Sequence, residues 1–243
     1  MRLLLGIPVY SSMEGKTAAS YMALSLRLGA NPYVRPIGLC MPHRTQMVKA
    51  RHRIVEEAFE RDMTHILWLD DDMVVMPDVL DRLAIHQKAI VGGLCHKRLP
   101  PYSPLVLHRQ KNDKGEEEDN WWWDHPEHGL HEVLGTGFGC LLTATQVFHD
   151  MDPPWFEEKT GGAGSDLYFC SRAREAGHQV YVDFDVDVKH LGQREEAGSA
   201  RRREWVQAHP EQAQIQNCVQ MEQAEDRAHT SRPGTTIVIN PFD

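Results

Sequence analysis

The chain has 243 residues, of which 41% are hydrophobic and 8% aromatic, and its formal net charge is −9. This composition is sufficient for a normal core, so it excludes a disordered chain, and the acidic balance argues against a surface that coats nucleic acid broadly. The five cysteines are scattered and lack C-x-x-C spacing, which is typical of reduced thiols in a cytoplasmic protein. Because no segment has the length and apolar character of a secretion signal or a membrane span, we expect a cytoplasmic protein without a membrane partner.

The first part of the chain alternates strand-like and helix-like segments. Strands are predicted over residues 2–9, 34–39, 65–69 and 89–94, and helices from Ser11 or Ser12 to Leu28, over 45–63 and over 77–86. In the second helix, apolar residues recur at spacings of three and four, as on the buried face of an amphipathic helix. This order predicts a mixed α/β fold in which a mainly parallel sheet with right-handed crossovers is flanked by helices.

The second part of the chain is less regular. Short strands are predicted over residues 105–108, 130–134, 180–183 and 186–190, with an acidic, Trp-rich insert over 111–129. Ser165 is predicted to cap a helix that runs through Ala176 and ends at Gly177. Residues 195–223 have helical composition, and 235–240 have strand-like composition. We therefore predict a main domain over 1–192 and a helical C-terminal extension over 193–243.

Three consecutive aspartates, Asp70, Asp71 and Asp72, follow the apolar run over residues 66–69. Such a run predicts a buried strand, and ligands of open α/β sheets bind beyond the carboxyl ends of the strands. Three adjacent carboxylates repel one another, and a Mg²⁺ or Mn²⁺ ion that carries a diphosphate would neutralise them. The alternative is a solvated turn in which an aspartate caps the helix that follows Pro77.

Further motifs accompany the aspartates in a fixed order along the chain: Ala50-Arg51, residues 67–73, 90–93, 135–138, 154–156, 164–170 and 177–190. Their order and spacing, from Arg2 to about Gly192, resemble those of GT-A-fold glycosyltransferases of the family 2 type, especially the compact stand-alone forms of bacteria and their phages. The resemblance implies a GT-A, Rossmann-like domain, a nucleotide-sugar donor with UDP-sugar favoured, and an acceptor hydroxyl. In a phage-encoded protein the location would be the host cytoplasm.

The resemblance implies that the first strand and the second helix bind the nucleotide. Pro8, Val9 and Tyr10 match the turn that holds the base in such enzymes, partly through backbone contacts. Arg51 matches an arginine that faces the nucleotide. An ordinary strand-to-helix turn and a solvated helix arginine are the alternatives for Tyr10 and Arg51.

The resemblance also divides the tasks of the aspartate triplet, which contains the DxD pattern. Asp70 matches the carboxylate that reaches the ribose or the base, and Asp72 matches the ligand of a Mn²⁺ or Mg²⁺ ion. Asp71 is a candidate for either task, contact with the ribose or base or binding of the metal, because the triplet leaves the register of the motif open. His190 matches the histidine that completes the metal site, with a structural or solvated histidine as the alternative.

Asp166 follows a glycine-rich loop and matches the catalytic base of inverting relatives. A role as helix cap is the alternative, although Ser165 can already serve as one. The segment of Gly135, Thr136 and Gly137 matches the lining of the cavity for acceptor and donor sugar, because glycines allow a close approach of the backbone. Trp155 is predicted to offer a stacking surface in that cavity, with core filling as the alternative.

The implied reaction is a single displacement with inversion, and retention is the alternative. The resemblance allows hydroxymethylpyrimidines in DNA, polysaccharides or proteins as acceptors. Bases could stack on residues 121–123, which are three tryptophans, and the basic stretches 97–98, 109–111 and 201–203 could contact phosphates. Solvated surface is the alternative for these basic stretches.

Two other classes of protein share part of this pattern. A nucleotidyltransferase also places acidic metal ligands on an α/β sheet, but it usually carries a glycine-rich, basic phosphate loop after the first strand. Residues 8–12 read Pro-Val-Tyr-Ser-Ser and lack such a loop. A non-catalytic nucleotide-sugar-binding module would not need a metal site together with Asp166.

Overall fold

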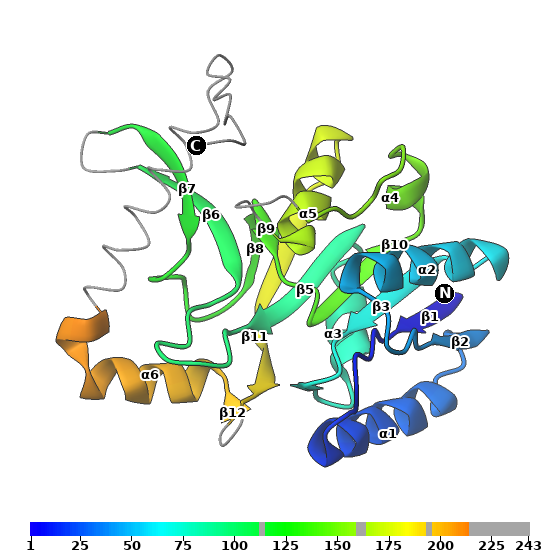
Figure 1. Cartoon of the computed structure of the whole chain (residues 1–243), viewed down its shortest axis with the longest axis horizontal. Coiled ribbons are helices and arrows are strands. Elements are labelled where there is room, and N and C mark those ends of the chain that lie inside the picture. The colour runs from blue at the N-terminus through cyan, green and yellow to red at the C-terminus, as the bar shows by residue number, and fades with distance from the viewer. Residues whose placement is uncertain (112–114, 159–163, 193–195, 214–243) are drawn as a thin grey trace, which may run out of the picture.

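The computed structural model describes residues 1–111, 115–158, 164–192 and 196–213. The helices and strands along the chain (Figure 1) are β1 Leu3–Gly6, α1 Gly15–Ala30, β2 Ile37–Cys40, α2 Met47–Glu60, β3 His65–Leu69, β4 Met73–Val74, α3 Val79–Ala84, β5 Ile90–Cys95, β6 Val106–Lys111, β7 Glu117–Trp121, β8 Leu130–Val133, β9 Gly135–Thr136, β10 Cys140–Ala144, α4 Gln146–His149, α5 Ser165–Glu175, β11 Val180–Leu191, β12 Glu196–Ala197 and α6 Ser199–Ala208. In this part of the chain, no helix is both long and apolar enough to cross a membrane.

The main sheet has the strand order β12-β11-β5-β10-β3-β1-β2, with β4 and β8 also paired to β11. Strands β1, β2, β3, β5 and β11 run in one direction, and β10 lies antiparallel between β3 and β5. A separate three-stranded sheet has the order β7-β6-β9. The architecture confirms the predicted fold class, a mixed, mainly parallel sheet flanked by helices.

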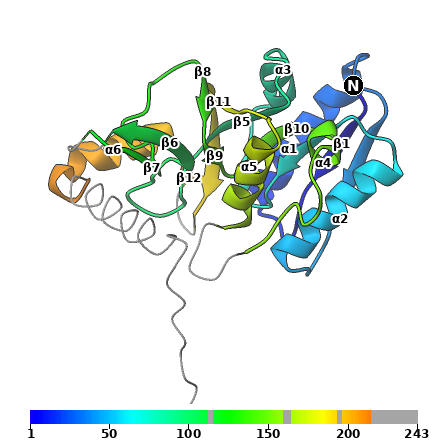
Figure 2. The same ribbon diagram turned by 90° about the horizontal axis from the view of Figure 1, so that it is seen from above.

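Side chains of successive strand residues enter two different hydrophobic layers, as the pleat of a strand requires. In β3, Ile66 and Trp68 pack into the layer beneath α2, α4 and α5, whereas Leu67 and Leu69 pack into the layer beneath α1 and α3. Figure 2 shows α2 and α3 on opposite sides of the strands. Since all four side chains are 0–1% exposed, each contributes about 1.5–3 kcal/mol of burial free energy.

Strand β11 runs unbroken from Val180 to Leu191, where the sequence predicts two short strands. Its pairing with β5 shifts in register between Asp183 and Asp187, so a bulge replaces the predicted break. The acidic insert also differs from the prediction, because it contains β7, which pairs antiparallel with β6. Cross-strand pairs such as Arg109 with Asp119, whose Nε and Oδ1 lie 2.8 Å apart, accompany this pairing.

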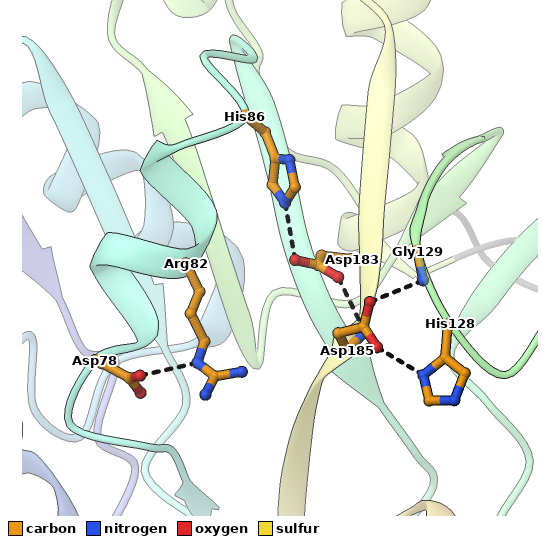
Figure 3. A network of polar contacts seen from close by, with 7 residues as sticks. All are labelled: Asp78, Arg82, His86, His128, Gly129, Asp183 and Asp185. Atoms are coloured by element: carbon orange, nitrogen blue, oxygen red, sulfur yellow. Dashed lines mark hydrogen bonds and ion pairs between the residues drawn. The ribbon is translucent and has the colours of Figure 1, made fainter.

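The bulge of β11 is held by a polar network (Figure 3). His86 Nε2 lies 2.8 Å from Asp183 Oδ2, and the Asp185 N–H donates to Asp183 Oδ1 at 2.9 Å. Asp185 in turn accepts the Gly129 N–H at 2.9 Å and lies 2.7 Å from His128 Nδ1. The network therefore ties the segment after α3 and the turn before β8 to the same strand.

Two predicted helix starts are wrong. Helix α1 begins at Gly15 rather than at Ser11 or Ser12, and α5 has Gly164 rather than Ser165 at its N-cap position. Ser165 is the first helical residue, where its hydroxyl accepts a hydrogen bond from Arg51 instead of capping the helix. At the other end of α5, Gly177 has a φ of 92°, which fits its predicted role of ending the helix.

The described part of the C-terminal extension packs on the rest of the molecule. Strand β12 pairs with β11, and the Arg202 guanidinium lies 4.7 Å from the ring centroid of Trp123. Helix α6 begins at Ser199 and ends at Ala208, so it starts later than predicted. Residues 214–223 and the predicted strand over 235–240 lie outside the described residues, and the domain boundary at 192 stays a prediction.

Candidate active site

The strands bring Asp72 and His190 together. Asp72 lies between β3 and β4, and β4 pairs antiparallel with β11 so that His190 faces Met73. The Leu191 N–H donates to the Asp72 carbonyl at 2.8 Å, and His190 Nε2 lies 3.1 Å from Asp72 Oδ2. The other ring nitrogen, Nδ1, donates to the His96 carbonyl at 2.8 Å, which fixes the orientation of the ring.

Asp72 and His190 stabilise each other's charged forms. Burial disfavours charge on both side chains, but the mutual hydrogen bond and attraction outweigh it. The pKa of Asp72 is accordingly lowered, and the pKa of His190 is raised. The guanidinium of Arg98, 3.2 Å from Asp72 Oδ2, further lowers the pKa of Asp72.

The pair fits a divalent cation that is shared with a substrate. A carboxylate oxygen and an imidazole nitrogen suit Mn²⁺, and Mg²⁺ or Mn²⁺ sites often combine one or two carboxylates with substrate phosphates. Among the described residues, no three His, Cys, Asp or Glu side chains converge on one ion. Asp72 and His190 would thus hold the ion together with oxygens of a bound diphosphate and water.

Asp70 and Asp71 lie in the same segment as Asp72, between β3 and β4. Asp70 Oδ1 is buried and has no hydrogen-bond partner among the described residues. Burial raises the pKa of Asp70 to about 6, the Arg51 charge lowers it, and the charge of Asp166 raises it further. Asp71 Oδ2 accepts the Tyr10 N–H at 3.1 Å, which joins the turn after β1 to the triplet.

The predicted base-binding turn lies directly after β1. Pro8 and Val9 are buried, and Val9 donates its N–H to the Pro42 carbonyl at 2.9 Å. The Tyr10 side chain is 74% exposed, beside the carboxylate of Asp71. An exposed aromatic ring at this edge is compatible with base stacking, and the nucleotide contact of these residues stays a prediction.

Arg51 lies beside Asp166 rather than on an open surface. Its side chain is 3% exposed, it donates to Ser165 Oγ at 2.7 Å, and it forms an ion pair with Asp166 Oδ1. Its guanidinium carbon lies 4.6 Å from the ring centroid of Phe138. Arg51 therefore positions the candidate base, a role that sequence reasoning missed because no motif links two residues 115 positions apart.

Asp166 keeps access to solvent in spite of these contacts. Its side chain is 32% exposed, and Oδ2 accepts the Phe138 N–H at 3.3 Å. A Cβ added at Gly137 would lie 3.8 Å from Oδ2, in ordinary contact, so the backbone beside the carboxylate is not crowded by a side chain.

The other residues predicted for the sugar cavity are buried. Gly135 lies against α5, because a Cβ there would be 2.7 Å from Leu167 Cδ2, and the Thr136 hydroxyl donates to the Leu105 carbonyl at 3.0 Å. Trp155 is 9% exposed, and its indole N–H donates to the carbonyls of Phe148 and Met151. This placement favours core filling for Trp155.

The three tryptophans of the insert point to different partners. Trp122 stacks on His108 at 3.8 Å and packs against the core, whereas Lys97 Nζ lies 5.4 Å from the Trp121 ring and Arg202 covers Trp123. Beside Lys97, the loop after β5 borders a cavity of about 410 Å³ next to His190. The cavity is lined by Lys97, Arg98, Leu99, Pro100, Pro101, Ser103, Leu105 and His190.

No protein-family model matches the chain, and the search of curated protein sequences finds no match. Among solved structures, A197 from STIV is similar with a TM-score of 0.58 and 18% identity, over 83% of this chain and 92% of A197. GalNAc-T7, solved with UDP, GalNAc and Mn²⁺, has a TM-score of 0.48 and 9% identity, over 85% of this chain and 48% of the GalNAc-T7 chain. The similarity to A197 shows a shared fold and assigns no activity.

Proposed function

We propose that the chain is a metal-dependent glycosyltransferase that moves a sugar from a nucleotide-sugar donor, a UDP-sugar, to an acceptor hydroxyl with inversion. The observation that carries the proposal is geometric: Asp72 Oδ2 lies 3.1 Å from His190 Nε2, and Asp166 forms an ion pair with the buried Arg51. Arg51, Asp166, Asp72 and His190 come from four separate segments, and all of them influence the pKa of Asp70. Sugar transfer from a diphosphate needs a base for the acceptor and a cation for the leaving group. Asp166 is the candidate base, and Asp72 and His190 are the candidate ligands of the cation.

The proposed mechanism gives each side chain one task. A divalent cation at Asp72 and His190 would stabilise the negative charge of the leaving nucleoside diphosphate. Asp166 accepts the proton of the acceptor hydroxyl, while Arg51 holds the carboxylate in place. The acceptor oxygen then attacks the anomeric carbon from the face opposite the leaving group, which inverts the configuration.

The donor side of the proposal is tested by nucleotide-sugar hydrolysis and transfer. Purified protein is incubated with labelled UDP- and GDP-sugars, with and without Mn²⁺, and released nucleoside diphosphate is measured. We expect Mn²⁺-dependent release that is fastest with a UDP-sugar. In a parallel incubation with a nucleoside triphosphate and a sugar phosphate, release of pyrophosphate would instead indicate a nucleotidyltransferase. Binding of a nucleotide sugar without turnover would indicate a binding module.

For the acceptor we propose a hydroxymethylpyrimidine in DNA, with polysaccharide and protein hydroxyls as the alternatives. The support is two contacts between basic side chains and tryptophans of the insert: Lys97 Nζ lies 5.4 Å from the Trp121 ring centroid, and the Arg202 guanidinium carbon lies 4.7 Å from that of Trp123. An extruded base needs stacking surfaces, and the DNA backbone needs cations.

The acceptor test uses labelled donors, Mn²⁺ and duplexes that contain 5-hydroxymethylcytosine or 5-hydroxymethyluracil, with unmodified DNA as the control. We expect label only on modified DNA, with transfer that falls steeply as salt rises. Donor hydrolysis without label on either modified DNA would discard this acceptor and leave a carbohydrate or a protein.

A further inference from the structure

Arg98 contacts the same oxygen atom of Asp72 as the candidate metal ligand His190 does. Its terminal nitrogen lies 3.2 Å from Asp72 Oδ2, and His190 Nε2 lies 3.1 Å from the same atom. The Arg98 side chain is 57% exposed and belongs to the loop that borders the 410 Å³ cavity. A cation is therefore already present where a divalent ion would bind.

Arg98 and a divalent ion cannot both bind Asp72 Oδ2 without strong repulsion. Two unit charges 4 Å apart repel by about 4 kcal/mol at an effective dielectric constant of 20, and the doubled charge of the ion doubles this repulsion. The long, half-exposed side chain of Arg98 can turn away from Asp72 at little cost. Arg98 and His190 both line the 410 Å³ cavity, so this cavity offers a space that the guanidinium can enter.

A guanidinium that leaves a carboxylate prefers another planar or tetrahedral oxyanion. Phosphate groups accept two parallel hydrogen bonds from arginine, and this geometry makes arginine a common phosphate ligand. The diphosphate of a donor bound at Asp72 and His190 would lie beside this cavity. Arg98 would thus lose one anionic partner and gain another in the same binding event.

We propose that Arg98 is an exchangeable counter-ion, which pairs with Asp72 in the free protein and turns to the donor diphosphate when the divalent ion binds. The inference rests on the proposed function. It makes Arg98 a competitor of the ion in the absence of nucleotide and a ligand of the nucleotide in its presence. Removal of Arg98 should therefore change two affinities in opposite directions, which a purely structural arginine would not do.

The test measures two binding constants on the full chain. Binding of Mn²⁺ alone is followed by the loss of the electron paramagnetic resonance signal of free Mn²⁺, and binding of UDP is followed by calorimetry at saturating Mn²⁺. In Arg98→Ala, Mn²⁺ alone should bind about two- to fivefold more tightly, as expected from the loss of an exposed ion pair. UDP should bind about tenfold or more weakly, as expected from the loss of a charge-assisted hydrogen bond.

Two further variants keep the result interpretable. Arg98→Lys retains the charge, so its Mn²⁺ affinity should stay near that of the wild type, while its UDP affinity should fall part of the way. Arg27→Ala removes an arginine of similar exposure that pairs with Asp81, and neither affinity should change. Weaker Mn²⁺ binding in Arg98→Ala, or unchanged UDP binding, would overturn the exchange. A wild-type chain that binds neither Mn²⁺ nor UDP with Mn²⁺ would overturn the proposed function itself and the inference with it.

Discussion

His190 Nε2 lies 3.1 Å from Asp72 Oδ2, although 118 positions separate the two residues in the sequence. The backbone sets this distance, because β4 pairs with β11 and the Leu191 N–H donates to the Asp72 carbonyl. A pair fixed by strand pairing is preorganised for a ligand, since little side-chain freedom is lost on binding.

His190→Ala should weaken Mn²⁺ binding measured in the presence of UDP. Loss of an outer-shell partner already costs about 10- to 100-fold in metal affinity, and the loss of a direct ligand should cost at least as much. The control is His178→Ala. His178 Nε2 also lies close to an aspartate, 2.9 Å from Asp150 Oδ2, but it follows the C-terminal end of α5. Equal losses in the two variants would refute a specific role for His190.

Asp166→Asn should lower turnover by about 100-fold or more while UDP-sugar affinity stays within a few-fold, because the amide keeps the shape but accepts no proton. Both constants are measured at a temperature where the variant is fully folded. Asp119→Asn, on the exposed β6–β7 pair, serves as the control. Near-native turnover in Asp166→Asn would leave Asp166 as a structural partner of Arg51 only.

Local sequence patterns were sufficient to predict most of the sheet. The run over 65–69 forms β3 with the predicted bounds, since an apolar run flanked by turn residues has few other solutions. Strand β10, which lies antiparallel between β3 and β5, was not predicted, because strand pairing is a property of the whole chain. The unbroken β11 was missed for a similar reason: its bulge depends on Asp185 and on the turn at Gly129.

The resemblance predicted that two distant residues would lie together, but it did not predict the contacts around them. Asp72 and His190 were expected to converge, and they lie at hydrogen-bond distance. The burial of Arg51 against Asp166 was not predictable, because an arginine in an amphipathic helix is usually solvated. Arg98 was considered only as a phosphate contact for DNA, since nothing in its local sequence points to Asp72.

Arg51→Met should destabilise the fold by about 2–4 kcal/mol, because it leaves Asp166 without its buried partner. In the Asp166→Asn background, the same substitution should cost less, and the difference is the coupling of the pair. Urea unfolding of the two single variants and the double variant measures it. Arg53→Met removes an exposed arginine of the same helix that pairs with Glu57, and it should destabilise the fold much less than Arg51→Met does. Purely additive effects of Arg51→Met and Asp166→Asn would contradict the ion pair.

Gly93→Ala should destabilise the junction of β5 and β11. A Cβ at Gly93 would lie 2.8 Å from the Val186 carbonyl oxygen and 2.7 Å from Val188 Cγ2, so the backbone of β11 would have to move. Such overpacking costs about 1–3 kcal/mol. Gly29→Ala is the matched control, because nothing lies within 4 Å of its added Cβ and alanine favours helix α1. Gly93→Ala as stable as the wild type in thermal unfolding would show that the two strands are not in close contact.

His96→Leu should make the protein less sensitive to acid. His96 is 0% exposed, and neither ring nitrogen has a hydrogen-bond partner among the described residues. Burial, followed by the charge of Arg202, lowers the pKa of His96 to about 3. The imidazole thus stays neutral in the folded state, while in the unfolded chain it takes up a proton below about pH 6.5.

This difference in proton binding decides whether stability rises or falls with pH. Because the unfolded state binds the extra proton, His96 adds stability that is present above pH 6.5 and is lost as the pH falls toward 3, by up to about 1.4 kcal/mol per pH unit. Urea unfolding at pH 6.5, 5.5 and 4.5 should show a steeper loss for the wild type than for His96→Leu. His43→Leu, which removes an exposed histidine, should keep the wild-type slope. Parallel pH profiles for the wild type and His96→Leu would mean that His96 is protonated in the folded protein, with its ring reached by water.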